Sequence, residues 1–212
     1  MFSKYREEIE FIKKRDPAAR SDFEIYFLYK GFKALRYYRR ANAAYKKGKF
    51  FWARFLSERA KFKTGIEIHP AATIGKGFFI DHGTGVVIGE TTEIGDNCVI
   101  YQGVTLGGTG KETGKRHPTL GNNVMVGAGA KVLGPIKIGN NVKIAAGAVV
   151  LSDIPDNSTA VGVPARVVRV GGVPVQDLDQ VHIPDPISQE LCRLEARIAK
   201  LEKKLENQNE DL

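Results

Sequence analysis

Two short stretches of this 212-residue chain place an ionisable residue directly before a histidine. The first reads FIDHGTGVVIGET (79–91) and contains Asp81 and His82, and the second reads GGTGKETGKRHPT (107–119) and contains Arg116 and His117. An imidazole titrates near neutral pH and can take a proton from a hydroxyl group. A guanidinium offers a planar set of donors that matches a carboxylate. These residue types are suited to proton transfer and to binding of a charged small molecule.

Both stretches interrupt a repeat of six residues. Between residue 66 and about residue 170 an aliphatic residue recurs at every sixth position, and glycine often follows it. The thirteen aliphatic positions are Ile68, Ile74, Ile80, Ile88, Ile94, Ile100, Leu106, Leu120, Val126, Val132, Ile138, Ile144 and Val150. This period fits neither a helix nor an alternating strand and is typical of a parallel β-helix. The sequence therefore predicts a left-handed parallel β-helix over residues 65–170, with Cys98 as a small core residue.

The repeat slips at two points. Ile80 and Ile88 are eight residues apart, and Leu106 and Leu120 are fourteen apart, two more than two repeats. A solenoid tolerates an insertion where a turn bulges outward, and such bulges can carry binding groups. Each histidine of the opening stretches lies within one of these slips. We therefore expect the two insertions to form the functional site.

The segment before the repeat, residues 1–64, is expected to be an α-helical domain. Its aromatic residues recur at spacings of three and four, as do Phe23 and Phe27. Asp16 followed by proline predicts a helix start, with an N-cap and a proline in the first turn. Gly48 is expected to separate two helices.

The segment after the repeat divides into a linker and a helix. Residues 171–187 are rich in Pro, Gly and Asp and are expected to be a linker. In residues 188–212 a heptad seam predicts an amphipathic or coiled-coil helix, and its positions are Leu191, Leu194, Ile198, Leu201 and Leu205. This helix could join three tails in a trimer or pack on its own subunit.

Composition narrows the class of protein. The net charge is +8 and the pI is about 9.4, but no nucleic-acid motif accompanies the basic residues, so we interpret them as solvated helix faces. The first residues contain no apolar region of a secretory signal, and no apolar run approaches the ~20 residues of a membrane span. Two distant cysteines indicate reduced thiols. We expect a cytoplasmic protein that binds neither nucleic acid nor membrane.

Each histidine also has a less specific interpretation. His82 could be a structural turn residue, and His117 could be a solvated loop residue. His69, which precedes Pro70, is interpreted as structural, and His182 as an inert linker residue. Trimeric β-helices can bind zinc through histidines of neighbouring subunits, but no HxxxxH or HxH pattern occurs in the chain. We therefore expect no metal.

Longer stretches match one family closely. They are GIEIHPAATIGKGFFIDHGTGVVIGETTEIGDN, VTLGGTGKETGKRHP, VGAGAKVLGPIKIGNNVKIAAGAVVL and AVGVPARVV, and upstream RDPAAR and LYKGFKALRYYR. Over nearly all of residues 12–170 the chain resembles the serine O-acetyltransferases, hexapeptide-repeat acyltransferases. The resemblance implies transfer of acetyl from acetyl-CoA to the hydroxyl of L-serine, giving O-acetyl-L-serine and CoA, the first step of cysteine biosynthesis.

The resemblance also assigns residues. It implies that His82 is the general base and that Glu67, where better-known members have Asp, supports its imidazole. It implies serine-binding roles for Asp16, Asp81, Arg116 and His117, and it implies CoA contacts from Gly108, Thr109, Ala128, Lys143, Ala146 and Arg166. The glycine-rich loop at 107–110 offers backbone donors for an oxyanion. Because neither cysteine lies at a slip, we expect direct transfer without an acyl-enzyme.

The expected partners are small molecules and copies of the chain. A three-sided prism favours a homotrimer. Longer members of the family join two trimers into a hexamer through a larger N-terminal region, so a dimer of trimers stays open for this chain. The family also docks O-acetylserine sulfhydrylase, commonly through a terminal isoleucine, whereas this chain ends in Glu-Asp-Leu. Three other functions stay open: an acetyltransferase for a sugar or amine, a non-catalytic trimeric scaffold that presents its tail, and a zinc-dependent trimer resembling carbonic anhydrases.

Overall fold

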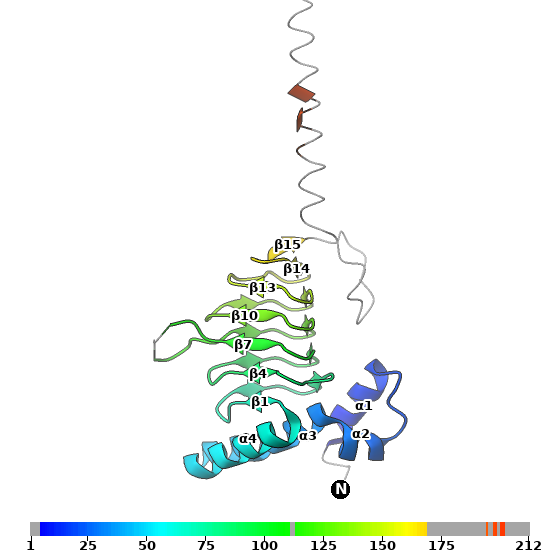
Figure 1. Cartoon of the computed structure of the whole chain (residues 1–212), viewed down its shortest axis with the longest axis vertical. Helices are drawn as coiled ribbons and strands as arrows, with labels where there is room; N and C mark the ends of the chain where they lie inside the picture. The colour runs from blue at the N-terminus through cyan, green and yellow to red at the C-terminus, as the bar shows by residue number, and fades with distance from the viewer. Residues whose placement is uncertain (1–4, 111–112, 169–193, 195–196, 199, 202–212) are drawn as a thin grey trace, which may run out of the picture.

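The middle of the chain winds into a three-sided prism of parallel strands (Figure 1). A computed structural model describes residues 5–110, 113–168, 194, 197–198 and 200–201. Sheet A contains β1 (Glu67–Ile68), β4 (Val87–Ile88), β7 (Thr105–Gly107), β10 (Lys131–Leu133) and β13 (Val149–Val150). Sheet B contains β2 (Thr73–Ile74), β5 (Glu93–Ile94), β8 (Thr119–Leu120) and β11 (Lys137–Ile138). Sheet C contains β3 (Phe79–Ile80), β6 (Val99–Ile100), β9 (Met125–Val126), β12 (Lys143–Ile144), β14 (Thr159–Val161) and β15 (Arg166–Val168), and only β15 runs antiparallel to its neighbour.

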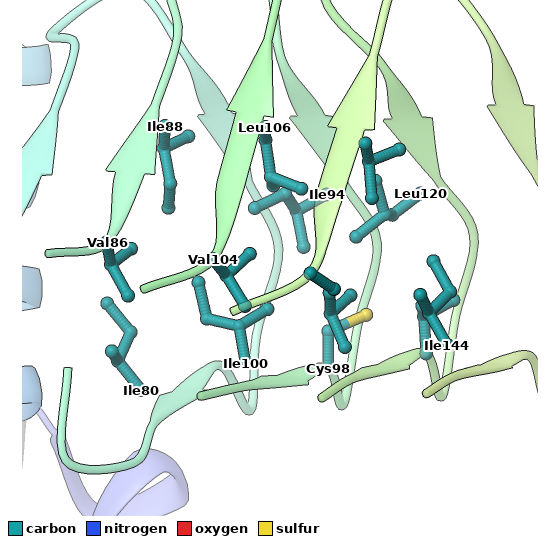
Figure 2. Packing of buried hydrophobic residues seen from close by; sticks show 14 of the residues in the cluster. Ile80, Val86, Ile88, Ile94, Cys98, Ile100, Val104, Leu106, Leu120 and Ile144 are labelled. Carbon is teal, nitrogen blue, oxygen red and sulfur yellow. The ribbon is translucent and has the colours of Figure 1, made fainter. Parts of the chain in front are cut away.

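The repeated aliphatic residues form the core of this prism. In sheet A, for example, Ile68 pairs with Ile88 and Ile88 pairs with Leu106, so equivalent residues stack from coil to coil. All thirteen predicted positions are at most 5% exposed, and burying one such side chain contributes about 1.5–3 kcal/mol. Figure 2 shows the stacked side chains together with Cys98, which lies inside the prism as expected. The left-handed β-helix predicted from the six-residue period is confirmed.

The first slip of the repeat is a two-residue insertion at one corner. We name as the C/A corner the turns that lead from sheet C to sheet A, residues 81–86, 101–104, 127–130 and 145–148. Asp81 N–H bonds to Ile100 O and Gly103 N–H bonds to Thr84 O, both at 2.9 Å. The residues between these two bonded positions, His82 and Gly83, therefore have no counterpart in the next coil. The prediction that a histidine lies within the inserted turn is confirmed, because His82 is one of the two inserted residues.

The second slip differs from the sequence interpretation. Strands β7 and β8 occupy consecutive sides of one coil, so the fourteen residues from Leu106 to Leu120 are one repeat plus eight extra residues and not two repeats plus two. The extra residues lengthen the connection between β7 and β8, residues 108–118, whose described parts extend from the prism at the level of β7 (Figure 1). We name as the A/B corner the turns from sheet A to sheet B, residues 69–72, 89–92, 108–118 and 134–136.

In the described residues four helices precede the prism: α1 (Arg6–Arg15), α2 (Asp22–Leu28), α3 (Lys30–Lys46) and α4 (Phe50–Thr64). Asp16 lies at the C-terminal end of α1 and starts no helix, so that expectation was wrong. Its carboxylate instead accepts the Ala18 N–H at 2.8 Å. This side-chain hydrogen bond closes a turn, and such a turn competes with helix formation. Ser21 is the N-cap of α2, and Gly48 separates α3 from α4 as expected.

Helices α3 and α4 close the lower end of the prism, where the first coil would otherwise expose unpaired carbonyl groups. Their side chains donate to these carbonyls: Ser57 Oγ to Ile68 O at 2.8 Å, Asn42 Nδ2 to Pro70 O at 2.8 Å, Tyr38 Oη to Ala72 O at 2.5 Å and Arg39 to Ile74 O at 2.6 Å. The packing is close, because a Cβ added to Gly31 of α3 would lie 2.0 Å from Ile80 O. Helix α3 is thereby fixed against the strand that precedes Asp81.

The outer parts of the chain are described only in part. The predicted linker at 171–187 lies outside the described residues, as does most of the predicted helix at 188–212. Within it, Leu194, Ile198 and Leu201 have helical backbone and are about half exposed. None of the helices that the structure describes is both long and apolar enough to cross a membrane.

Candidate functional site

The inserted residues at the C/A corner present His82 to solvent. The His82 backbone has a φ of 56°, a left-handed conformation that is uncommon for a residue with a side chain. Its N–H donates to Asp81 Oδ1 at 2.9 Å, and its side chain is 75% exposed, with Nε2 4.0 Å from the same oxygen. The turn thus holds the imidazole outside the core, where it can meet a substrate.

Acidic groups gather beside this imidazole. Burial raises the pKa of Asp81, and the nearby Asp16 carboxylate raises it further, whereas the His82 ring lowers it. Tyr29 Oη donates to Asp16 Oδ2 at 2.6 Å, and burial together with this bond raises the pKa of the phenol. The helical segment and the first insertion therefore bring two carboxylates close to one histidine. Tyr29 was not predicted, because nothing in its local sequence distinguishes it.

The A/B corner holds the second histidine in a defined orientation. His117 is 8% exposed, and its Nδ1 accepts the Thr91 N–H at 3.2 Å and lies 2.9 Å from Thr91 Oγ1. That hydroxyl accepts the backbone N–H groups of Arg116 and His117 at 3.0 and 3.1 Å, so its own proton points to Nδ1. The neutral ring consequently carries its proton on Nε2. Burial, and then the charge of Arg116, lower the pKa of His117.

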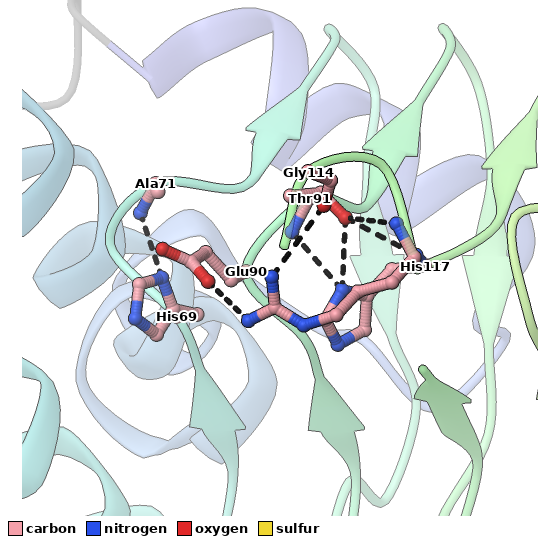
Figure 3. A network of polar contacts seen from close by, with 7 residues as sticks. His69, Ala71, Glu90, Thr91, Gly114 and His117 are labelled. Atoms are coloured by element: carbon pink, nitrogen blue, oxygen red, sulfur yellow. Dashed lines mark hydrogen bonds and ion pairs between the residues drawn. The ribbon is translucent and has the colours of Figure 1, made fainter. Parts of the chain in front are cut away.

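Arg116 lies beside this ring and is paired with a carboxylate. Its guanidinium donates to Glu90, and that bond holds the pKa of Glu90 below its ordinary value. Figure 3 shows Glu90, Thr91 and His117 as one polar network, with His69 next to Glu90. His69 Nδ1 accepts the Ala71 N–H at 3.2 Å, which supports its interpretation as a structural residue. The sequence did not predict roles for Glu90 and Thr91, although they end the stretch FIDHGTGVVIGET (79–91).

Glu67 does not contact the imidazole that it was expected to support. Within the described part of the chain its only charged partner is Lys61, with Oε2 2.6 Å from Nζ, and no hydrogen bond or ion pair joins it to His82. The carboxylate within 4.0 Å of His82 is that of Asp81. The longer side chain of Glu67 lets it reach across to α4.

Four of the six expected CoA residues lie at the C/A and A/B corners, and the other two, Lys143 and Arg166, lie in sheet C. Gly108 and Thr109 follow β7 at the A/B corner, and Ala128 and Ala146 follow β9 and β12 at the C/A corner. Gly147 N–H donates to Ala128 O at 2.8 Å, which stacks the last two turns. Lys143 begins β12, and Arg166 begins β15, whose partner strand β14 lies beside β12.

His82 and the predicted serine-binding residues thus form two groups at opposite edges of sheet A. The group with Asp16, Asp81 and His82 lies where a coil enters sheet A, and the group with Arg116 and His117 lies where it leaves. One group has an exposed imidazole next to carboxylates, and the other has a cation and a buried imidazole. Among the described residues no cluster of three His, Cys, Asp or Glu side chains has the geometry to hold a metal ion.

The chain is similar to a family of hexapeptide-repeat transferases and to serine acetyltransferases. Residues 117–152 match the family described as bacterial transferase hexapeptide (six repeats). The serine acetyltransferase of Bacillus pumilus is 53% identical over 205 residues, which are 96% of this chain and 94% of that protein.

Solved structures give the same assignment. A Neisseria gonorrhoeae serine acetyltransferase in complex with serine has a TM-score of 0.73 and 47% identity, with 77% of this chain and 67% of that chain covered. A Brucella abortus serine acetyltransferase in complex with coenzyme A has a TM-score of 0.75 and 45% identity, with 78% of this chain and 66% of that chain covered.

Proposed function

The chain belongs to the serine acetyltransferase family, and we propose that it transfers acetyl from acetyl-CoA to the hydroxyl of L-serine with His82 as the general base. The observation that carries this proposal is the inserted pair His82-Gly83, which presents an imidazole beside Asp81 and Asp16. The complexes of the Neisseria and Brucella enzymes with serine and coenzyme A support the choice of substrates. The product, O-acetyl-L-serine, enters cysteine biosynthesis, and we place the reaction in the cytoplasm.

The active site is assembled between subunits of a homotrimer. The C/A and A/B corners are separated by the width of sheet A, so one chain does not bring His82 to Arg116. A threefold axis parallel to the prism sets the C/A corner of one subunit against the A/B corner of the next, and it does so three times. Each site would then combine the base with the cation, and the stacked CoA residues would continue the same cleft.

Serine is a zwitterion and needs opposite charges at its two ends. Arg116 would exchange its bond to Glu90 for a bidentate bond to the serine carboxylate. Asp16 and Asp81 of the neighbouring corner would receive the ammonium group. The arrangement leaves the hydroxyl of serine directed at His82.

His82 then takes the serine proton while the oxygen attacks the thioester carbonyl, and such a base contributes about 10²–10⁴-fold. The tetrahedral intermediate carries an oxyanion, for which the backbone N–H groups at 107–110 and the Nε2–H of His117 are donors. The carbon–sulfur bond breaks, and the imidazolium returns its proton to the CoA sulfur. Glu67 supports the imidazolium after Lys61 releases it, a rearrangement that substrate binding would drive.

Acetyl-CoA is bound along the cleft above the serine site. Gly108 and Thr109 of one subunit, and Ala128 and Ala146 of the next, lack bulky side chains and leave room for the pantetheine arm. Lys143 and Arg166 would meet the phosphate groups, because cations neutralise them. Transfer is direct, without an acyl-enzyme, and Cys98 is no nucleophile because it is buried and burial raises the pKa of its thiol to about 11.

An acceptor panel tests the proposal. The protein is incubated with acetyl-CoA and L-serine, homoserine, a galactoside or glucosamine, and release of the CoA thiol is followed. We expect a clear preference for L-serine, because Arg116 and the two carboxylates match both ends of an amino acid. Activity with a sugar alone would contradict the acceptor assignment.

A further inference from the structure

The groove between α3 and α4 concentrates positive charge. Lys33, Arg36 and Arg40 are three and four residues apart, so they share one face of α3. Lys63 faces them from α4, and with Tyr37 these residues line a cavity of about 160 Å³. The groove lies at the helical end of the molecule, whereas Lys143 and Arg166 lie toward the other end (Figure 1).

Within the part of the chain that the structure describes, no carboxylate is paired with the cations of this groove. Among the described residues none of the four lining cations forms an ion pair. The acidic residues of α4 and β1 are engaged elsewhere, Glu58 with Arg54 at 2.8 Å and Glu67 with Lys61 at 2.6 Å. Like charges in one small cavity repel each other, so an anion between them would remove an unfavourable interaction.

Two polar groups point to the same conclusion. Arg36 stacks on Tyr26, with its guanidinium carbon 3.8 Å from the ring centroid, so this cation is held in place at the groove. Burial raises the pKa of Tyr37, but hydrogen bonds from Lys63 and Arg59 outweigh it and lower that pKa overall. The cations of the groove therefore favour the ionised, negatively charged form of the Tyr37 phenol.

We propose that the α3–α4 groove binds a small, multiply charged oxyanion, of the class of phosphate, sulfate or pyrophosphate. Arg36 is held in place by Tyr26 and can donate from a preorganised fork, and Lys33, Arg40 and Lys63 supply point charges. A cavity of 160 Å³ has the volume of about five liquid waters. This suits one or two phosphoryl groups and not a whole nucleotide.

Calorimetric titration of the full-length protein tests this site. Pyrophosphate, inorganic phosphate and sulfate are compared with chloride and acetate at matched ionic strength, and ADP and CoA are included as organic phosphates. We expect binding of the multiply charged oxyanions and a rise of the unfolding temperature by about 5 °C at saturation. Chloride and acetate should give neither effect. Tighter binding of ADP or CoA than of pyrophosphate would overturn the assignment of a free oxyanion.

Charge-matched variants locate the site. Arg40→Gln with Lys63→Gln should weaken pyrophosphate binding by about tenfold or more, because two charge-assisted contacts are lost. Lys46→Gln with Lys49→Gln removes the same charge at the other end of the helical hairpin and should leave the affinity unchanged. Arg36→Lys keeps the charge but removes the planar guanidinium fork, and it should also weaken binding. Equal losses in the groove and control variants, or no binding by the unaltered protein, would overturn the proposal.

Discussion

Thr91 and His117 are 26 residues apart in the sequence, yet Thr91 Oγ1 lies 2.9 Å from His117 Nδ1. Because the same hydroxyl accepts two backbone N–H groups, it donates to the ring and leaves the proton of a neutral imidazole on Nε2. The second insertion is thereby attached to the turn that follows β4. This relationship turns a loop histidine into a fixed hydrogen-bond donor.

We predict that Thr91→Val lowers kcat/KM for serine by about tenfold, since His117 loses the bond that orients it. Thr91→Ser keeps the hydroxyl and should retain most of the activity. Steady-state kinetics measure the effect, and circular dichroism checks the fold. Equal activity of the Val and Ser variants would contradict an orienting role for the hydroxyl.

The titration of His117 provides a pH prediction. Its pKa is lowered in the folded state by burial and by Arg116, so the folded protein binds fewer protons than the unfolded chain as the pH falls. The contribution of this residue to stability is therefore complete above the unfolded value of ~6.5 and is lost as the pH falls through the folded pKa. NMR titration of labelled imidazoles should show His117 titrating below 6.5, with the Nε2–H tautomer at neutral pH. A pKa above 6.5 would refute this assignment.

Gly89 supplies the space for this ring. A Cβ at Gly89 would lie 1.9 Å from His117 Cδ2 and 2.0 Å from Nε2, so Gly89→Ala must displace the imidazole. We expect a loss of about 1–3 kcal/mol in the free energy of unfolding, and lower activity. In a His117→Ala background the same substitution should cost much less, because the clash is absent. Denaturant unfolding of the unaltered protein, the two single variants and the double variant measures this coupling. If the two losses of stability are additive, Gly89 does not serve to accommodate the His117 ring.

The sequence predicts the core better than it predicts the contacts of the inserted loops. Leu106 and Val132 could be assigned to the interior because a six-residue period leaves an inward position in every repeat. The loop at 108–118 has no period, so its attachment to Thr91 depends on how coils stack in three dimensions. The prediction of a helix start at Asp16 was wrong for a similar reason. Its carboxylate accepts a hydrogen bond from Tyr29, thirteen residues away, and the residues next to Asp16 do not indicate this contact.

His82 can be tested without disturbing the turn that presents it. Asn tolerates the left-handed backbone of this residue better than Ala does, so His82→Asn should keep the unfolding temperature. We expect kcat to fall by about 10²–10⁴-fold, because Asn cannot take the serine proton. Asn97→Ala serves as a control, since it removes a side chain at another position with positive φ and should leave kcat unchanged. Full turnover in His82→Asn would remove His82 from the mechanism.

The proposed trimeric site predicts complementation between inactive variants. His82→Asn damages the C/A corner, and Arg116→Gln damages the A/B corner. The two proteins are unfolded together and refolded as mixed trimers. A site is intact only if its C/A corner comes from the Arg116→Gln chain and its A/B corner comes from the His82→Asn chain. Random assembly of equal amounts therefore gives about a quarter of the unaltered activity. Mixing His82→Asn with Asp81→Asn should restore nothing, because both changes affect the same corner. If the first mixture is no more active than its components, His82 and Arg116 do not serve one site across a subunit boundary.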